Sequence, residues 1–244
     1  APNGCRIRYA PASFELTQPA TVHKFELRQL RDGAPWVIGR AGMHYRDLIP
    51  DRLGGSIIAS HIRIPEAGPV PDVVHYHTIG FQLIYCYKGW VRLVYEDQGP
   101  PFVLHAGDCV TQPPQIRHRV LEASENLEVV EIGVPADHMT TVDHEMELPT
   151  AHFRPGREFK GQVFCHHQLA KAKWQPHGST GFESRDAGVA RATRGLADVQ
   201  VFKAGEGSVE WVLQHCADIL YSFVLEGSAR LLREGHTHLK SVSH

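Results

Sequence analysis

The stretch that decides the fold runs from His75 to Val94 and reads HYHTIGFQLIYCYKGWVRLV. It begins with two histidines one residue apart, continues through an apolar run, turns at Lys88-Gly89 and enters a second apolar run. Runs of this length that are rich in β-branched and aromatic residues predict two β-strands joined by a tight turn. Because side chains alternate along a strand, we expect His75 and His77 to lie on the same face.

The same stretch returns in the second half of the chain. His75–Val94 aligns without a gap with Leu213–Leu232, and in this alignment Gly89 meets Gly227. Outside it, Arg46-Asp47 recurs as Arg185-Asp186 at nearly the same offset. A near-constant offset over such a distance predicts an internal duplication.

Each half reads as short strands separated by turns. Four segments of the first half have strand composition, namely Ser56–Ile64, Phe81–Tyr87, Trp90–Glu96 and Asn126–Val134. The 16 prolines and 22 glycines favour many turns over long helices, and His167–Trp174 is the best helix candidate. We therefore expect an all-β chain of two small barrels or jelly rolls in tandem.

Composition argues against several classes of protein. The 244 residues carry a formal net charge of −2, which provides no basic field for nucleic acid or an anionic membrane. No apolar run is long enough for a membrane span, and the first residues lack a signal-peptide pattern. The five cysteines are widely spaced, which disfavours a disulfide framework and a thiolate zinc site. We expect a cytoplasmic protein that binds neither nucleic acid nor membranes.

Further landmarks follow the first histidine pair. With Gln82, Gly89, Gly107, Pro113 and His118, the chain reads H-x-H-x4-Q-x6-G and then G-x5-P-x4-H. This pattern resembles the two motifs of the cupin superfamily, and the duplication makes the chain similar to a bicupin. The resemblance implies a jelly-roll barrel whose interior holds one metal. It places the metal ligands at His75, His77, Gln82 and His118.

Three positions depart from the cupin motifs. Asp72 lies near the place of the first-motif glycine, Gln115 replaces the second-motif glycine, and Gln82 stands where the family has glutamate. An amide oxygen binds a divalent cation less strongly than a carboxylate, so Gln82 either ligates weakly or hydrogen-bonds a metal-bound water. We expect one divalent metal ion, with Fe(II) favoured and Ni(II), Zn(II) or Mn(II) as alternatives.

The resemblance and the duplication predict an arrangement of domains. We expect an N-terminal arm over 1–35, a metal-bearing barrel over 36–135, a connector over 136–160 and a degenerate second barrel over 161–244. In the second copy, Leu213 and Leu220 replace His75 and Gln82, so we expect these leucines to fill the barrel interior without a metal. The second motif of this copy would begin one position past the last residue. We therefore expect either a shortened chain or completion by another segment or a partner chain, in a homodimer.

The expected surroundings of the metal suggest a small-molecule enzyme. We expect Tyr85, Tyr87, Trp90, Val110 and Leu121, or their neighbours, to line an apolar and aromatic pocket around the metal. The leading hypothesis is a dioxygenase that cleaves a C–C bond of a small enolisable or phenolic substrate, as several three-histidine cupins do.

Two alternatives to the dioxygenase remain open. One is a non-catalytic module that binds a small molecule, and the other is an oxygen-independent isomerase or lyase. Gln82 cannot accept a proton near neutral pH, which disfavours an isomerase that uses this position as its base. Tyr76 and Gln82 are the candidate catalytic residues, because either could hydrogen-bond a bound substrate. The other histidines, including His61 and His138, are expected to be structural or on the surface.

Overall fold

The structure is a computed structural model that describes residues 16–29, 31, 35–178, 180–205, 215–233 and 236–243. Nearly all regular structure in these residues is β-strand, as the sequence predicts. The helical elements are short turns: η2 (Arg40–Gly42), α1 (Arg52–Gly55), η3 (Leu169–Lys171) and α2 (Val189–Ala192). Within the described residues, no helix has the length and apolar character needed to cross a membrane.

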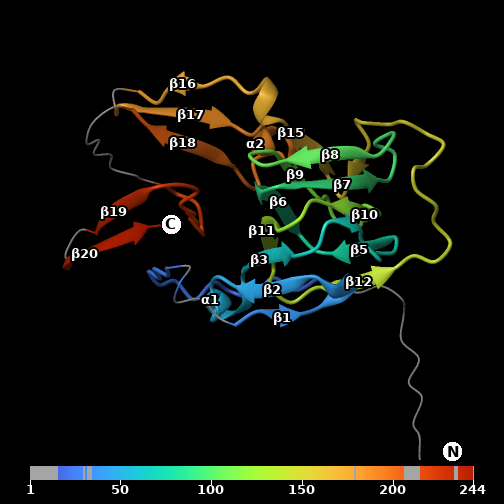
Figure 1. Cartoon of the computed structure of the whole chain (residues 1–244). Coiled ribbons are helices and arrows are strands. Elements are labelled where there is room, and N and C mark those ends of the chain that lie inside the picture. Colours follow the sequence, from blue (N-terminus) through green and yellow to red (C-terminus); the bar gives the residue numbers. More distant parts are fainter. Residues whose placement is uncertain are drawn as a thin grey trace, which may run out of the picture.

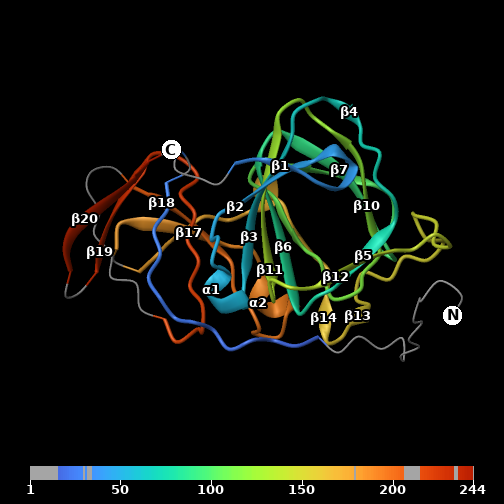
Figure 2. The same cartoon turned by 90° about the horizontal axis from the view of Figure 1, so that it is seen from below.

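Two sheets face each other across the core of the first half. The first has the order β1-β2-β3-β11-β6-β9-β15, with β1 (Val37–Ile38), β2 (His44–Asp47), β3 (Ile58–Ile64), β11 (Leu127–Val134), β6 (Phe81–Lys88), β9 (Cys109–Thr111) and β15 (Cys165–His167). The second has the order β12-β5-β10-β7-β8, with β12 (Met139–Val142), β5 (His75–Thr78), β10 (His118–Ala123), β7 (Trp90–Tyr95) and β8 (Phe102–His105), and β4 (Gly68–Pro69) also pairs with β10. The orders β3-β11-β6-β9 and β5-β10-β7-β8 are those of a jelly roll, which the end-on view in Figure 2 shows as a closed barrel.

Tyr85 and Tyr87 were expected to line the barrel interior, but side-chain alternation along β6 places them on the outer face of the sheet. Ile84 and Cys86 point into the core between the two sheets, whereas Tyr85 and Tyr87 belong to a second apolar cluster on the outer face of the first sheet. Both faces of β6 are buried, so its apolar pattern does not reveal which face lines the barrel. Of the predicted lining residues, Val110 lies in the inner cluster.

The barrel draws on segments outside the range expected for it. Strand β12, from the expected connector, pairs with β5, and β15, from the expected second barrel, pairs with β9. The helix expected over His167–Trp174 is reduced to the single turn η3, which follows β15 directly. The short pair β13 (Glu158–Phe159) and β14 (Gln162–Val163) lies between β12 and β15 along the chain.

The second half repeats the order of elements of the first. The three-stranded sheet of β16 (Gln175–Pro176), β17 (Phe182–Asp186) and β18 (Gln200–Ala204), with α2 between β17 and β18, repeats β1, β2, α1 and β3. The hairpin of β19 (Ser228–Arg233) and β20 (His236–Ser243) repeats β7 and β8. These strands lie beside the barrel and do not close a second barrel within the described residues (Figure 1).

Two side-chain pairs make the repeat visible in atomic detail. The Arg46 guanidinium stacks on the ring of Trp36 with its carbon 4.6 Å from the ring centroid. In the second half, Arg185 stacks on Trp174 at 5.5 Å. The matching pairs of arginine and tryptophan support the duplication predicted from the sequence offset.

The two halves meet across the outer face of the first sheet. Residues 219–225, the counterpart of β6, run along this face, and the rings of Tyr87 and Phe223 meet edge to face at 5.5 Å. Alternation points Tyr221 and Phe223 at the barrel, so Leu220 turns outward and is 48% exposed. The expectation that Leu220 fills a barrel interior is therefore wrong, and Leu213 lies outside the described residues.

Candidate metal centre

Three histidines meet inside the barrel, where β5 and β10 pair. His75 and His77 share the inner face of β5, and His118 lies directly opposite His75 in the antiparallel register. One ligand nitrogen from each ring lies within 4.8 Å of the others. Cross-strand neighbours on one face of a sheet are close enough for this convergence. The structure thus brings together the three histidines that the sequence pattern singles out.

Hydrogen bonds fix which nitrogen is available in two of the three rings. The Nδ1 atoms of His75 and His118 donate to the backbone carbonyls of Val73 (2.8 Å) and Ile116 (3.0 Å). His77 Nδ1 lies 2.8 Å from the hydroxyl of Thr140 on β12. Since a carbonyl can only accept, His75 and His118 present an unprotonated Nε2, the form in which imidazole binds a metal.

The electrostatic surroundings keep the three rings neutral. Burial is the main cause that lowers the pKa of His77 and His118 well below the usual value, and the neighbouring imidazoles add to it. Burial and the Arg40 guanidinium also lower the pKa of His75. Metal binding needs unprotonated imidazole. Because their pKa values are lowered, the three rings stay unprotonated at pH values somewhat below the usual histidine pKa.

Gln82 lies in the core and is linked to a buried carboxyl group. Its side chain is 1% exposed, and its Nε2 donates to Glu131 Oε1 on the neighbouring strand β11 at 2.5 Å. The remaining amide oxygen is buried and has no hydrogen-bond partner among the described residues. Burial raises the pKa of Glu131, although the hydrogen bond from Gln82 opposes the shift. The position at which the cupin motif has glutamate therefore holds an amide here, hydrogen-bonded to the Glu131 carboxyl group.

A cavity of about 400 Å³ opens next to the histidines. Most of its wall is apolar and comes from the inner faces of β3, β6, β7 and β11. The apolar lining residues are Met43, Ile58, Ile62, Ile64, Ile84, Val91, Leu93, Val120, Leu127 and Val129. His77 and His118 contribute to the wall, so a ligand in the cavity can contact the histidine group directly.

Sequence reasoning missed the polar residues of this cavity other than its histidine group, among them three with basic or acidic side chains. Arg40, Glu131 and His138 line it, and the His138 ring centre lies 5.6 Å from that of His77. They come from a 3-10 turn, from β11 and from the loop before β12, each far from the histidine motifs in the sequence. Glu131 alone carried a local signal, because it is a charged residue within the apolar run of β11.

Tyr76 is not part of the cavity. Alternation along β5 places it on the opposite face from His75 and His77, where the Arg117 guanidinium stacks over its ring at 4.3 Å. The expectation that Tyr76 hydrogen-bonds a bound substrate is therefore not supported. In a strand, the side chain between two residues that share one face points to the opposite face.

Two departures from the cupin motifs that the sequence resembles have structural explanations. Asp72 is buried, pairs with Arg40 and accepts a hydrogen bond from the backbone N–H of Val120 at 2.9 Å, so its carboxylate fastens the loop before β5 to β10. Gln115, which replaces a glycine, adopts a left-handed φ of +66°. The turn before His118 thus keeps a conformation that glycine adopts most easily.

The donor set fits a divalent transition metal. Imidazole nitrogens suit Zn, Fe, Ni and Cu, and the Nε2 of His75 is a buried acceptor without a partner in the described residues. The Gln82 amide oxygen is a second such atom. An unpaired buried polar atom costs about 1–3 kcal/mol, a cost that a bound cation would remove. The three histidines could therefore hold a metal, and the role of Gln82 as a fourth ligand stays a prediction.

Comparison with known proteins gives only distant likenesses. No family model matches the chain, and no curated protein matches it. Among solved structures, oxalate decarboxylase from Bacillus subtilis aligns at 16% identity and a TM-score of 0.37, over 51% of this chain and 34% of that one. Another oxalate decarboxylase structure aligns at 15% identity and a TM-score of 0.45, over 71% of this chain and 57% of that one. The coconut allergen cocosin aligns at 18% identity and a TM-score of 0.36, over 43% and 30% of the two chains. The activity of this chain is therefore inferred from its own residues.

Proposed function

We propose that this chain is a metal-dependent enzyme that uses dioxygen to cleave a C–C bond of a small enolisable or phenolic substrate. The observation that supports this most strongly is the convergence of three neutral imidazoles, His75, His77 and His118, next to an apolar cavity. A three-histidine set leaves coordination positions for a substrate and for a second small molecule. The cavity volume suits a small organic ligand.

The metal would supply Lewis acidity toward substrate oxygens and, as iron, redox chemistry with dioxygen. The chain's own residues would bind and orient the substrate. The apolar walls from β3, β7 and β11 exclude water and pack against a ring or alkyl portion. Arg40 lies in the same wall; its guanidinium is paired with Asp72 and would offer its remaining N–H groups to an enolate, phenolate or carboxylate of the substrate.

A second candidate is an oxygen-independent isomerase or lyase, and a specific observation favours it. Glu131 and His138 both line the cavity, and either can accept or donate a proton. Burial raises the pKa of Glu131, which brings a carboxyl group closer to the range useful for acid–base catalysis near neutral pH. The glutamine at position 82 therefore does not remove proton-transfer chemistry from the site.

Reconstitution with defined metals distinguishes these functions. The metal-free protein would be loaded with Fe(II) and screened in an oxygen electrode against β-diketones and catechols. Substrate-dependent oxygen uptake that disappears in His118→Ala and with Zn(II) supports the dioxygenase. Turnover with Zn(II) under anaerobic conditions, abolished in Glu131→Gln, supports the isomerase or lyase. Tight binding of a ligand without turnover under either condition would contradict both and leave a binding module.

A further inference from the structure

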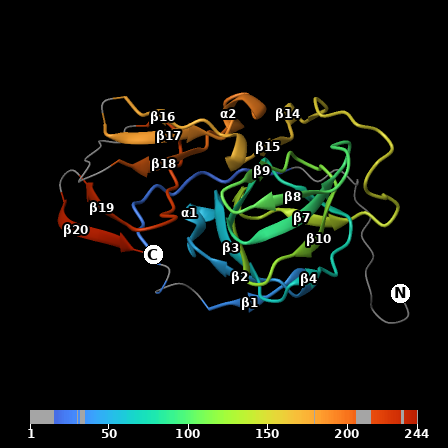
Figure 3. The ribbon, with the colours of Figure 1, turned by 45° about the horizontal axis from the view of Figure 1, so that its top comes forward.

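A second cavity lies at the junction of the two halves, away from the histidine group. It has a volume of about 500 Å³ and is lined by residues of β15, of η3 and of the segment from β17 to α2. Figure 3 shows β15 and α2 close together at this junction. None of the residues that line the metal-centre cavity lines this one.

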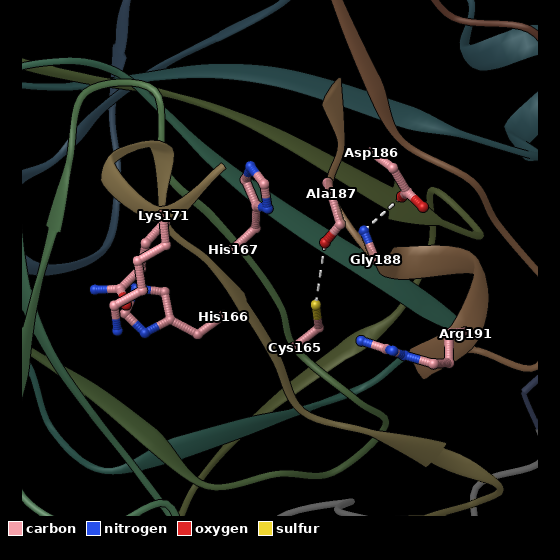
Figure 4. A pocket seen from close by; sticks show the side chains of 9 residues that line it. Cys165, His166, His167, Lys171, Asp186, Ala187, Gly188 and Arg191 are labelled. Atoms are coloured by element: carbon pink, nitrogen blue, oxygen red, sulfur yellow. Dashed lines mark hydrogen bonds between the residues drawn. The ribbon is translucent and has the colours of Figure 1, made fainter. Parts of the chain in front are cut away.

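Two positively charged, solvent-exposed side chains in this cavity have no ion pair within the described residues. Lys171 and Arg191 line it, and within the described part of the chain neither side chain forms a hydrogen bond or an ion pair. Figure 4 shows them at opposite ends of the pocket, with Cys165 and His167 between them. The one carboxylate in the lining, Asp186, accepts the backbone N–H of Gly188 at 2.6 Å. The lining therefore carries an excess of positive charge.

A third cation lies buried behind the cavity wall. Arg185 is 2% exposed, and it has no ion pair with a carboxylate among the described residues. Its guanidinium donates to the hydroxyl of Tyr85 and to the carbonyl of Gly107, and its Nε is buried without a partner. A buried charge without a counter-ion is costly and creates a positive potential at the nearest polar opening.

The same arginine determines the tautomer of a lining histidine. Arg185 can only donate, so the 2.6 Å contact between its guanidinium and His167 Nε2 makes this nitrogen an acceptor. The proton of the neutral ring is then on Nδ1, which is left as a donor. Nearby, the Nε2 of His166 is buried without a partner in the described residues. The cavity thus combines two cations with imidazole groups that have unused hydrogen-bonding capacity.

We propose that this cavity binds a small dianion, either a phosphate group or a dicarboxylate. The Lys171 ammonium and the Arg191 guanidinium hold it from opposite ends, and the Nδ1–H of His167 donates to it. Arg and Lys are the usual partners of phosphate and carboxylate oxygens, and charge-assisted hydrogen bonds are the strong ones. Because β15 belongs to the barrel sheet and α2 to the second half, a bound dianion also ties the two halves together.

The test measures binding of inorganic phosphate and of succinate by calorimetry, at constant ionic strength set with chloride. The variants are Lys171→Ala and Arg191→Ala, with Lys173→Ala as the matched control. Lys173 is exposed, as Lys171 is, and lies two residues away, but it does not line the cavity. We expect the parent to bind at least one of the two dianions, and each cavity variant to bind it about tenfold more weakly or worse. The control should bind within about twofold of the parent.

The two ligands identify the kind of anion that the cavity binds. Stronger binding of phosphate points to a phosphomonoester, and stronger binding of succinate to a dicarboxylate.

Three outcomes would overturn the proposal. The proposal fails if the parent binds neither dianion. It also fails if Lys173→Ala weakens binding as much as the cavity variants, because general charge attraction then explains the effect. Unchanged binding in both cavity variants would place the anion elsewhere. Circular dichroism checks that all three variants remain folded.

Discussion

Exchanging the amide and the carboxyl group between positions 82 and 131 tests the architecture of the candidate metal centre. In the structure the Gln82 amide donates to the Glu131 carboxyl group, and the Gln82 side chain is 1% exposed. Gln82→Glu removes the amide donor, so this hydrogen bond, worth about 1.5–3 kcal/mol when one partner is charged, re-forms only when one of the two carboxyl groups takes up a proton. It also places two carboxyl groups together in the core, where both cannot ionise. We expect the metal-free single variant to lose about 3 kcal/mol of unfolding free energy at neutral pH.

The double variant Gln82→Glu/Glu131→Gln should restore most of this loss. It re-forms one amide–carboxylate hydrogen bond with the polarity reversed, so its unfolding free energy should lie within about 1 kcal/mol of the parent.

The stability loss of the single variant Gln82→Glu should depend on pH. In Gln82→Glu the paired carboxyl groups have a folded-state pKa above the unfolded value, so the penalty is greatest at neutral pH. It decreases as pH falls through the folded-state pKa.

Urea unfolding of the metal-free parent, the two single variants and the double variant, followed by tryptophan fluorescence, gives the coupling energy between positions 82 and 131 directly. Metal titration of the same proteins adds an independent reading. The double variant places a carboxylate at the position that the cupin motif reserves for a ligand, so it should bind divalent metal more tightly than the parent. If the double variant is as unstable as the sum of the two single variants, Gln82 and Glu131 do not interact as described.

Three further outcomes follow from individual residues. Gln115→Gly should gain up to about 1 kcal/mol of unfolding free energy in urea titrations, because it relieves a left-handed φ of +66°, whereas Gln115→Val should lose stability. Burial of Asp97 opposes ionisation, but hydrogen bonds from Arg157, Thr150 and Arg154 lower its pKa overall. Its stabilising contribution should be complete above the unfolded-state pKa of about 3.9 and decline as pH falls through the folded-state value, so acid unfolding of Asp97→Asn should depend less on pH than that of the parent. Tyr76→Phe should leave metal content and any turnover unchanged, because its ring lies on the outer face of β5; loss of activity in this variant would contradict that placement.

The barrel could be predicted from the sequence because its signals are local. The four predicted strands of the first half correspond to β3, β6, β7 and β11 with ends shifted by at most two residues. That His75 and His77 share a face followed from strand alternation alone, which needs only the period of a strand. The placement of His118 beside them came from the resemblance to the cupin motifs.

The cavity lining could not be predicted as well, for two physical reasons. Strand β6 is buried on both faces, so its apolar residues do not distinguish the barrel interior from the junction with the second half. The position of Gln82 could have decided this, since an inward residue 82 requires inward residues 84 and 86 and outward Tyr85 and Tyr87. Arg40 and His138 reach the cavity through long-range packing of a 3-10 turn and a loop, which no local pattern encodes.

The central claim is that His75, His77 and His118 together bind one divalent metal ion. Plasma mass spectrometry of the purified protein, compared with His75→Ala, His118→Ala and the exposed-site control His144→Ala, tests it most directly. We expect about one equivalent of metal per chain in the parent and in the control, and almost none in the two site variants while circular dichroism shows them folded. Absence of metal from the parent after reconstitution, or equal metal in the site variants, would contradict the claim.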